Sequence, residues 1–477
     1  AVCFPSGENL DASWNPELIK KMGKALGDEC RYFKVNLLLA PAINIKRSPL
    51  GGRTYEYYSE DPYLTGEIAK GFVEGVQSTG TGTSIKHFLA NNSETLRINM
   101  SSDVDERALR EVYLYPYEMV VKESEPWTVM SSYNPVNGVQ MAENRKFLTD
   151  ILRTEWGFDG IVVSDWGGVK NRVKALKAGN DLDMPENNRN NRSVDEALKK
   201  GEVSIEELDT VVERLVEFAL KAKEAENFTD EVDFEAHRRI SNEVAEDSIV
   251  LLKNDDSILP LTNKKYRKAA VLGAFASEPR YQGGGCTLVN PIRIDTPLAE
   301  MNRLGESEGI EIAYAPAYSV KSMTTDEDIE SAVELAKDSD IAVVFAGLWT
   351  AYDREGFDRK HLKMDESHLR LIEEVIKVQK NTVVVLSTGD AVEMPWVDEV
   401  KGIIEAFLPG ETAGKAVADI LFGKVNPSGK LPTTYPKRLE DTPAYPFFPG
   451  ESRHHVYGEG IFVGHRYYDK KKIDVLF

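Results

Sequence analysis

The sequence is poor in cysteine and has no long apolar run. Three cysteines among 477 residues cannot build a disulfide framework, which favours a reducing compartment. We therefore expect a cytoplasmic protein, with a secreted form left open. The longest apolar run, residues 341–348, is far too short to span a bilayer. The chain begins without Met and ends abruptly at Phe477, which indicates a piece of a longer protein.

Basic residues are in the minority. The chain has 58 Lys and Arg against 78 Asp and Glu, which gives a net charge of −20. This balance argues against nucleic acid and against anionic membranes as partners. A neutral substrate held by hydrogen bonds is easier to reconcile with it. The length predicts two or three domains, and 42% apolar residues are enough to build large cores.

One stretch, residues 160–168, combines a buried strand with polar and aromatic side chains at its end. Residues 161–163 are all apolar, as in a parallel strand that is buried on both faces. Asp165 follows directly, at the carboxyl end, where parallel α/β folds bind their ligands. Trp166 offers a flat apolar face for a sugar or a base. Capping of the next helix is the alternative role for Asp165, and this stretch alone leaves both open.

The first half of the chain has the pattern of a parallel sheet. Strand signals near positions 37, 85, 129, 162 and 182 alternate with helical patterns. Polar residues follow these strands, which suits one pocket at the strand ends of a (β/α)8 barrel. Because only about five or six of the eight strands are signalled, we expect an α/β fold with an incomplete barrel. A doubly wound sheet is the alternative.

A second α/β region follows a polar, helix-poor stretch at residues 227–237. Helical patterns separate four strand-like apolar runs, at residues 269–272, 341–346, 382–386 and 403–407. They predict another mostly parallel sheet, an α/β sandwich domain. Residues 281–286 form a glycine-rich loop without the spacing or the Lys of a phosphate-binding loop, so we interpret it as a tight backbone feature. The prolines after Pro427 predict an extended tail.

Several side chains are candidates for catalysis or substrate binding. They are Arg53, Lys86, His87, Asp165 and a carboxylate within residues 353–359. Glycoside hydrolysis requires two carboxylates flanking the bond, because one attacks or stabilises the sugar and the other protonates the leaving oxygen. Cations and an imidazole beside the attacking acid would hold sugar hydroxyls and keep that acid ionised. The alternatives are solvated side chains and, for residues 353–359, a surface ion-pair cluster.

Longer motifs occur in a specific order along the chain. They are Gly52-Arg53-Thr-Tyr-Glu-Tyr-Tyr-Ser-Glu-Asp61, Lys86-His87-Phe-Leu-Ala-Asn-Asn-Ser-Glu94, Val129-Met-Ser-Ser-Tyr133-Asn, Val163-Ser-Asp165-Trp166, Tyr281-Gln-Gly-Gly-Gly, Glu355-Gly-Phe-Asp-Arg359 and Asn426-Pro-Ser-Gly-Lys-Leu-Pro432. Together they closely resemble glycoside hydrolase family 3, in particular its β-glucosidases. The resemblance covers nearly the whole chain.

The resemblance implies a retaining mechanism shared by two domains. Asp165 matches the nucleophile that forms the glycosyl-enzyme, and Glu355 matches the general acid/base on a loop of the second domain. That acid must keep its proton near neutral pH, so we expect burial and the nearby nucleophile to raise its pKa. No metal or organic cofactor is implied. The residues that match sugar-binding positions are Arg53, Lys86, His87, Met130, Tyr133 and Trp166.

The same resemblance divides the chain. We expect a partial (β/α)8 barrel domain over residues 1–222, a linker over 223–245, an α/β sandwich domain over 246–440 and an extended tail over 441–477. The family's barrel normally begins with a segment that carries a Ser-Asp-Gly-Pro motif, and a fibronectin-like module would follow the tail. Neither corresponds to anything in this sequence. We leave open a homo-oligomer, or a companion chain that supplies the missing segments.

The predicted activity is that of a retaining, exo-acting β-glucosidase on terminal β-D-glucosyl residues of β-glucosides or short gluco-oligosaccharides. A β-xylosidase or α-L-arabinofuranosidase of the same fold is the first alternative. A Schiff-base aldolase that uses Lys86 is another, although it leaves Asp165 and Trp166 unexplained. A non-catalytic sugar-binding chain or an impaired fragment is the third. The family's N-acetylglucosaminidases are disfavoured, because no second His follows the Lys86-His87 pair in the corresponding motif.

Overall fold

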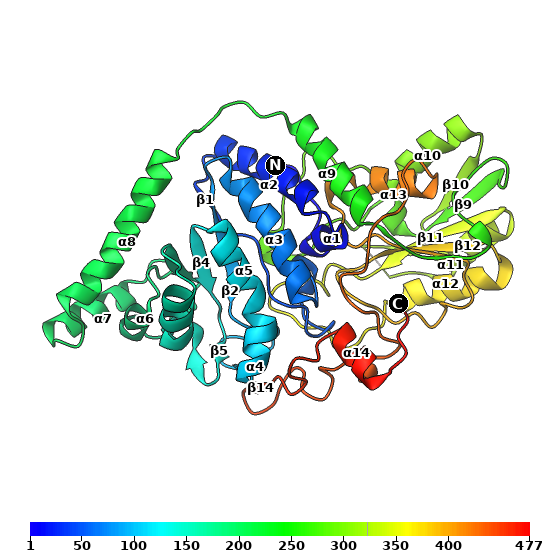
Figure 1. The fold of residues 1–477 in the computed structure, drawn as a ribbon. Coiled ribbons are helices and arrows are strands. Elements are labelled where there is room, and N and C mark those ends of the chain that lie inside the picture. Colours follow the sequence, from blue (N-terminus) through cyan, green and yellow to red (C-terminus); the bar gives the residue numbers. More distant parts are fainter. Residues whose placement is uncertain (322) are drawn as a thin grey trace.

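A computed structural model describes residues 1–321 and 323–477 of the chain. Figure 1 shows a first α/β domain that contains the N-terminus and a second α/β domain beside it. The elements of the first part are α1 (Gly7–Ala12), α2 (Pro16–Tyr32), β1 (Leu37–Leu38), α3 (Pro62–Gln77), β2 (Gly82–Phe88), β3 (Ser101–Asp103), α4 (Glu106–Ala108), α5 (Tyr115–Ser124), β4 (Thr128–Ser131), β5 (Pro135–Val136), β6 (Val139–Gln140), β7 (Ile161–Ser164), α6 (Arg172–Ala178), α7 (Asn188–Lys199) and α8 (Ile205–Glu224).

The two long helices at the start of this domain begin where their sequences predict. The Asn15 side chain accepts a hydrogen bond from the Leu18 N–H and caps α2, and Asp61 does the same for α3 through the Leu64 N–H. Each cap is followed by a proline at the first helical position, where the missing N–H costs nothing. The two helices pack against each other beside the sheet.

The sheet of the first domain is parallel, in the order β1-β2-β4-β7. Strands β2, β4 and β7 are buried at every position except Lys86, as expected for a sheet that is covered on both faces. All four carboxyl ends therefore lie at one edge, and the polar residues that follow the strands meet there. Residues 181–184, which we predicted to be a strand, make only a single bridge from Leu182 to Val163.

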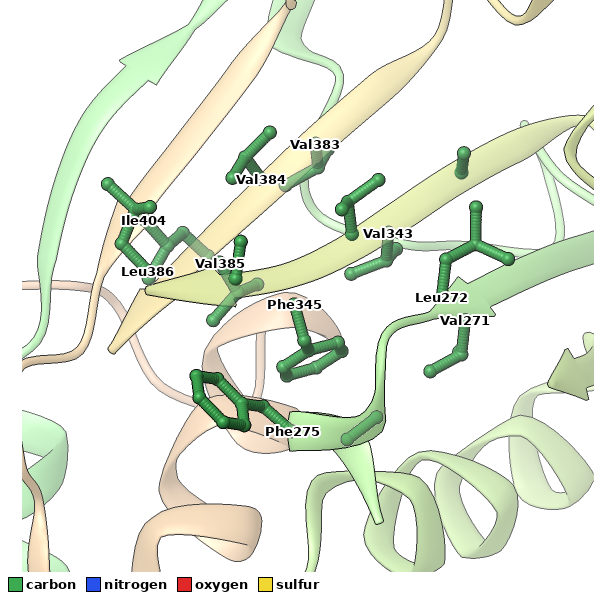
Figure 2. Packing of buried hydrophobic residues seen from close by; sticks show 14 of the residues in the cluster. Val271, Leu272, Phe275, Val343, Phe345, Val383, Val384, Val385, Leu386 and Ile404 are labelled. Atoms are coloured by element: carbon green, nitrogen blue, oxygen red, sulfur yellow. The ribbon is translucent and has the colours of Figure 1, made fainter. Parts of the chain in front are cut away.

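The second domain is also an α/β domain. Its elements are α9 (Phe234–Ser248), β8 (Val250–Asn254), β9 (Lys268–Leu272), α10 (Pro297–Glu308), β10 (Glu311–Ala315), α11 (Asp326–Lys337), β11 (Ile341–Gly347), α12 (Glu366–Val378), β12 (Thr382–Ser387), β13 (Gly402–Glu405) and α13 (Ala413–Leu421). The strand order is β10-β9-β11-β12-β13-β8, parallel except for β8. Figure 2 shows the apolar core on this sheet, where Val343, Phe345 and Val385 pack with Phe275.

Three elements of the second domain were not predicted. The sequence of residues 240–252 predicts one helix, whereas in the structure this run divides into the end of α9 and the antiparallel edge strand β8. Strand β10 is short, only partly buried and at the opposite edge of the sheet. Helix α10 precedes it and packs against it. Edge strands carry a weaker apolar signal than central ones, because one side of the ladder faces away from the sheet.

The connection between the domains and the end of the chain are both more ordered than the sequence suggested. Helix α9 packs against α1 and α2 of the first domain and against α13 of the second. Near the C-terminus, β14 (His454–Val456) pairs with β3, and α14 (His465–Lys471) follows. The predicted tail therefore returns to the first domain. Within the described residues, no helix is both long and apolar enough to cross a membrane.

Candidate active site

Asp165 lies at the carboxyl end of β7, as its position in the sequence predicted. Its backbone N–H donates to the Ser131 carbonyl oxygen of β4 at 2.9 Å, which continues the sheet by one residue. Its Oδ1 atom accepts the Trp166 N–H at 2.7 Å. Its Oδ2 atom lies 3.7 Å from His87 Nε2. Burial raises the pKa of Asp165 above its ordinary value, whereas the Arg53 charge, the Trp166 N–H and the Tyr133 hydroxyl act to lower it.

The Lys86-His87 pair lies at the end of β2, the neighbour of β4. His87 is buried, and Asn44 holds it by accepting the His87 backbone N–H at 2.8 Å and by donating to its carbonyl oxygen at 2.9 Å. Burial, together with the charges of Arg53, Lys86 and Arg97, places the pKa of His87 well below 6.5. The imidazole beside Asp165 is therefore neutral and can exchange hydrogen bonds with a sugar hydroxyl.

Glu355 lies in the connection between β11 and α12 of the second domain and reaches the first domain. Its Oε1 atom is 2.7 Å from Arg97 Nη2 and 3.7 Å from Arg53 Nη1. Arg53 itself is buried and pairs with Glu56. The segment that contains Glu355 is therefore part of an interface between the two domains and not a surface ion-pair cluster, which was the alternative interpretation of residues 353–359.

Arg97 and Glu94 belong to the site but were not predicted to do so. Arg97 forms ion pairs with both Glu94 and Glu355. Its Nη1 atom is 2.7 Å from Glu94 Oε2, and its Nη2 atom pairs with Glu355. Its guanidinium also stacks over the Tyr133 ring, 4.2 Å from the centroid. In the sequence, Glu94 closes the Lys86–Glu94 motif, and both residues lie in the polar loop that follows β2, where a single charged residue is ordinarily solvated.

The expected sign of the pKa shift at Glu355 was wrong. Burial acts to raise the pKa of this carboxyl, as predicted. The neighbouring Cys286 thiol and the charges of Arg53 and Arg97 outweigh burial and lower the pKa to about 2. In this arrangement Glu355 is a carboxylate, which suits a general base. To act as an acid, it needs a weaker interaction with these cations.

The glycine-rich loop at residues 281–286 supports the Glu355 segment, and it is the tight backbone feature that we expected. A Cβ atom on Gly283 would lie 2.1 Å from the Tyr55 ring, so only glycine allows this approach. The Tyr55 hydroxyl donates to the Gly284 carbonyl oxygen at 2.7 Å, and the Gly284 N–H donates to the Asp353 carbonyl oxygen at 2.9 Å. The loop thus holds the start of the Glu355 segment against the first domain.

The remaining predicted residues near Asp165 differ in their burial and in their contacts. Tyr133 is buried beneath Arg97, and the charges of Asp165 and Glu355 both contribute to raising its pKa, after burial. Trp166 is 58% exposed, so its face is open to a ligand. Met130 packs in an apolar cluster with Ile161 and Val163.

This arrangement can support acid–base chemistry on a sugar. One carboxylate comes from each domain, the neutral His87 lies beside Asp165, and the cationic Arg53 and Arg97 lie beside Glu355. Glycoside hydrolysis requires such a pair of carboxylates. Among residues 1–321 and 323–477, no three His, Cys, Asp or Glu side chains are grouped so as to hold a metal ion.

Two α/β domains that each bring a carboxylate to one site form a two-domain protein with the pair of acids that glycoside hydrolysis uses. Family models identify it more closely. Residues 1–218 match the Glycosyl hydrolase family 3 N terminal domain, and residues 249–465 match the Glycosyl hydrolase family 3 C-terminal domain. The chain belongs to glycosyl hydrolase family 3, as its motifs indicated, with the predicted barrel-type and sandwich-type fold.

Individual relatives agree with this assignment. The chain is 47% identical over its whole length to "Thermostable beta-glucosidase B" of Acetivibrio thermocellus and covers 63% of that protein. It is 45% identical to an "Exo-alpha-(1->6)-L-arabinopyranosidase" of Bifidobacterium longum and covers 64% of it. The chain thus spans less than two thirds of both relatives. The crystal structure of a Bifidobacterium adolescentis GH3 β-glucosidase superposes with a TM-score of 0.95, at 44% identity, over 100% of this chain and 70% of that one.

Proposed function

We propose that the protein is a retaining, exo-acting β-glucosidase. The observation that carries the proposal is that Asp165 and Glu355, one from each domain, share neighbours. Arg53 lies 3.7 Å from Glu355 and its charge acts on Asp165, and the charges of both acids act on Tyr133. Relatives named β-glucosidases support glucose as the sugar. The substrates are then β-glucosides or short gluco-oligosaccharides with a free non-reducing end.

In the proposed mechanism, Asp165 attacks the anomeric carbon while Glu355 gives a proton to the leaving oxygen. Glu355 then takes a proton from water, which attacks the same carbon and releases Asp165. Arg53, Lys86 and His87 hold hydroxyls of the sugar, and Trp166 supplies an apolar face. Two displacements at one carbon keep the β configuration.

An α-L-arabinopyranosidase is the second candidate, and the relative at 45% identity favours it. α-L-Arabinopyranose, like β-D-glucose, carries its leaving group equatorially, so the same two carboxylates can serve both sugars. It differs in lacking the hydroxymethyl group and in its axial C4 hydroxyl. A β-xyloside lacks only the hydroxymethyl group and stays the third candidate. Recognition at C4 and C5 would separate the three.

Hydrolysis of three matched aryl glycosides tests these proposals. We expect the full-length protein to show its highest kcat/KM on the aryl β-D-glucoside, with lower values on the β-D-xyloside and the α-L-arabinopyranoside. NMR of the early product should show β-glucose first. A higher kcat/KM on the arabinopyranoside would show that an α-L-arabinopyranoside, and not a β-glucoside, is the substrate. Appearance of α-glucose as the first product would overturn the retaining mechanism. Sugar binding in calorimetry without turnover would show a non-catalytic protein.

A change at Arg97 should move the pH dependence. In Arg97→Met, loss of the positive charge is expected to raise the pKa of Glu355 from about 2, because burial then acts with less opposition. Glu355 must be protonated to act as the acid, so a higher pKa extends activity to higher pH. The alkaline limb of kcat/KM should therefore shift upward by about one pH unit or more.

Arg97→Lys is the matched control, since it keeps the charge and should leave the alkaline limb near that of the parent. The position of the limb, and not the height of the profile, is the readout, because both changes can also weaken sugar binding. An unchanged limb in Arg97→Met would contradict the electrostatic account of this site.

A further inference from the structure

The carboxylate of Asp358, three residues after Glu355, accepts hydrogen bonds from several groups of the first domain. The donors and their distances are the Gly52 N–H at 3.2 Å, the Ser93 hydroxyl at 2.9 Å, the Glu94 N–H at 2.9 Å, the Thr95 N–H at 2.7 Å and the Thr95 hydroxyl at 2.7 Å. Hydrogen bonds to an ionised acceptor are roughly twice as strong as neutral ones. Asp358 is part of the Glu355–Arg359 motif, but the sequence alone indicated no role for it.

The donors belong to the two segments that carry the site. Gly52 immediately precedes Arg53, and residues 93–95 lie just before Arg97. Asp358 therefore fixes the loop that carries Glu355 to two segments of the first domain. One segment leads to Arg53 and the other to Arg97, and these are the two arginines that pair with Glu355. A displacement of Asp358 would move Glu355 relative to both arginines at once.

Backbone contacts on either side of Asp358 strengthen this attachment. The Gly356 N–H donates to Glu94 Oε2 at 2.6 Å, and the Arg359 N–H donates to the Leu50 carbonyl oxygen at 2.7 Å. A Cβ atom on Gly52 would lie only 1.6 Å from the Phe357 carbonyl oxygen, so the loop approaches the first domain as closely as a glycine allows. The two domains are therefore in close backbone contact at this loop.

We propose that Asp358 is a positioning residue that latches the Glu355 loop of the second domain onto residues 52 and 93–95 of the first. It sets the place of the proton donor relative to Asp165, and it does so without touching the substrate. The inference rests on the proposed function, because it concerns the proton that Glu355 transfers. A misplacement of about 1 Å at such a group can cost about 100-fold in rate.

Asp358→Asn tests the proposal through the leaving group. The amide replaces one acceptor oxygen with a donor, which would face N–H and O–H groups that already donate. We expect kcat/KM on an alkyl β-glucoside, whose leaving oxygen needs a proton, to fall by about 30-fold or more. On 2,4-dinitrophenyl β-glucoside, whose leaving group departs without a proton, the fall should stay within about 3-fold. Thr95→Val, which removes a single donor, should give a smaller change in the same direction.

Asp340→Asn is the matched control. Asp340 is another acid of the second domain that accepts backbone N–H groups, from Arg267 and Lys268, and it lies at the opposite end of the sheet from Glu355. It should change both rates equally or not at all. In a Glu355→Gln background, Asp358→Asn should cause little further loss on the alkyl glucoside, within about 3-fold, if it acts through Glu355.

The outcomes separate the inference from the proposed function. If the parent protein hydrolyses both glucosides but Asp358→Asn and Thr95→Val lower both rates by equal factors, Asp358 has only a structural role and the inference is wrong. Full additivity with Glu355→Gln would also overturn it. If the parent hydrolyses neither glucoside, the proposed function fails, and the inference fails with it.

Discussion

Asp165→Asn is expected to lower kcat on aryl β-glucosides by at least about 10³-fold. An amide is a very weak nucleophile, so the glycosyl-enzyme cannot form at a useful rate. Asn has nearly the same shape, and its carbonyl oxygen can still accept the Trp166 N–H, which binds Asp165 Oδ1 at 2.7 Å. The fold and sugar binding should therefore survive. Steady-state kinetics and calorimetric titration with glucose measure the two effects separately.

Asp159→Asn is the matched control for this change. Asp159 is exposed and lies just before β7, at the opposite end of the same strand from Asp165. Its replacement should leave kcat within about 2-fold of the parent value, as expected for a surface substitution. If Asp165→Asn kept more than about a tenth of the parent activity, Asp165 could not be the nucleophile.

Glu355→Ala should give the second largest loss, and its size should depend on the substrate. For an alkyl glucoside or a gluco-oligosaccharide, kcat/KM should fall by about 10²- to 10⁴-fold, the range for a missing general acid. For 2,4-dinitrophenyl glucoside, formation of the glycosyl-enzyme should stay fast and its hydrolysis should become slow. A burst of dinitrophenol followed by slow turnover would report both effects.

Azide provides a sharper readout on the same variant. It needs no general base, so it should attack the anomeric carbon of the glycosyl-enzyme, expel the Asp165 carboxylate and release β-glucosyl azide. We expect turnover to rise with azide concentration in Glu355→Ala and to stay unchanged in Glu373→Ala, whose acid is exposed on α12. Absence of β-glucosyl azide together with an equal loss on all leaving groups would exclude Glu355 as the acid/base.

Much of the fold could be predicted because its signals are local. The Asn15-Pro16 and Asp61-Pro62 pairs fix the starts of α2 and α3 through side-chain caps that lie within three residues. The central strands β9, β11 and β12 of the second domain each contain a continuous apolar run. The edge strands β8 and β10 could not be predicted as well, since they are only partly buried and their pattern merges with that of neighbouring helices.

Site residues could be predicted where a reactive residue type stands at the end of a predicted strand or within a recognisable motif. Asp165 was predicted from its position after a buried strand, His87 from its position at the end of one, and Glu355 from its motif. Arg53, one partner of Glu355, was among the predicted residues, but its contact with Glu355 was not predicted, and Arg97 was not predicted at all. Arg97 is more than 250 positions from Glu355 in the sequence, and only the contact between the domains brings its charge within 2.7 Å. For the same reason the pKa of Glu355 was expected to rise, whereas the structure lowers it.

Covalent trapping is the measurement that tests the central claim most directly. The full-length protein is incubated with 2-deoxy-2-fluoro-β-D-glucosyl fluoride, its intact mass is measured, and the labelled peptide is mapped. The account predicts one fluoroglucosyl group per chain, attached to Asp165, and loss of activity in step with labelling. A label on another residue, or a protein that hydrolyses glucosides but never acquires the label, would contradict it.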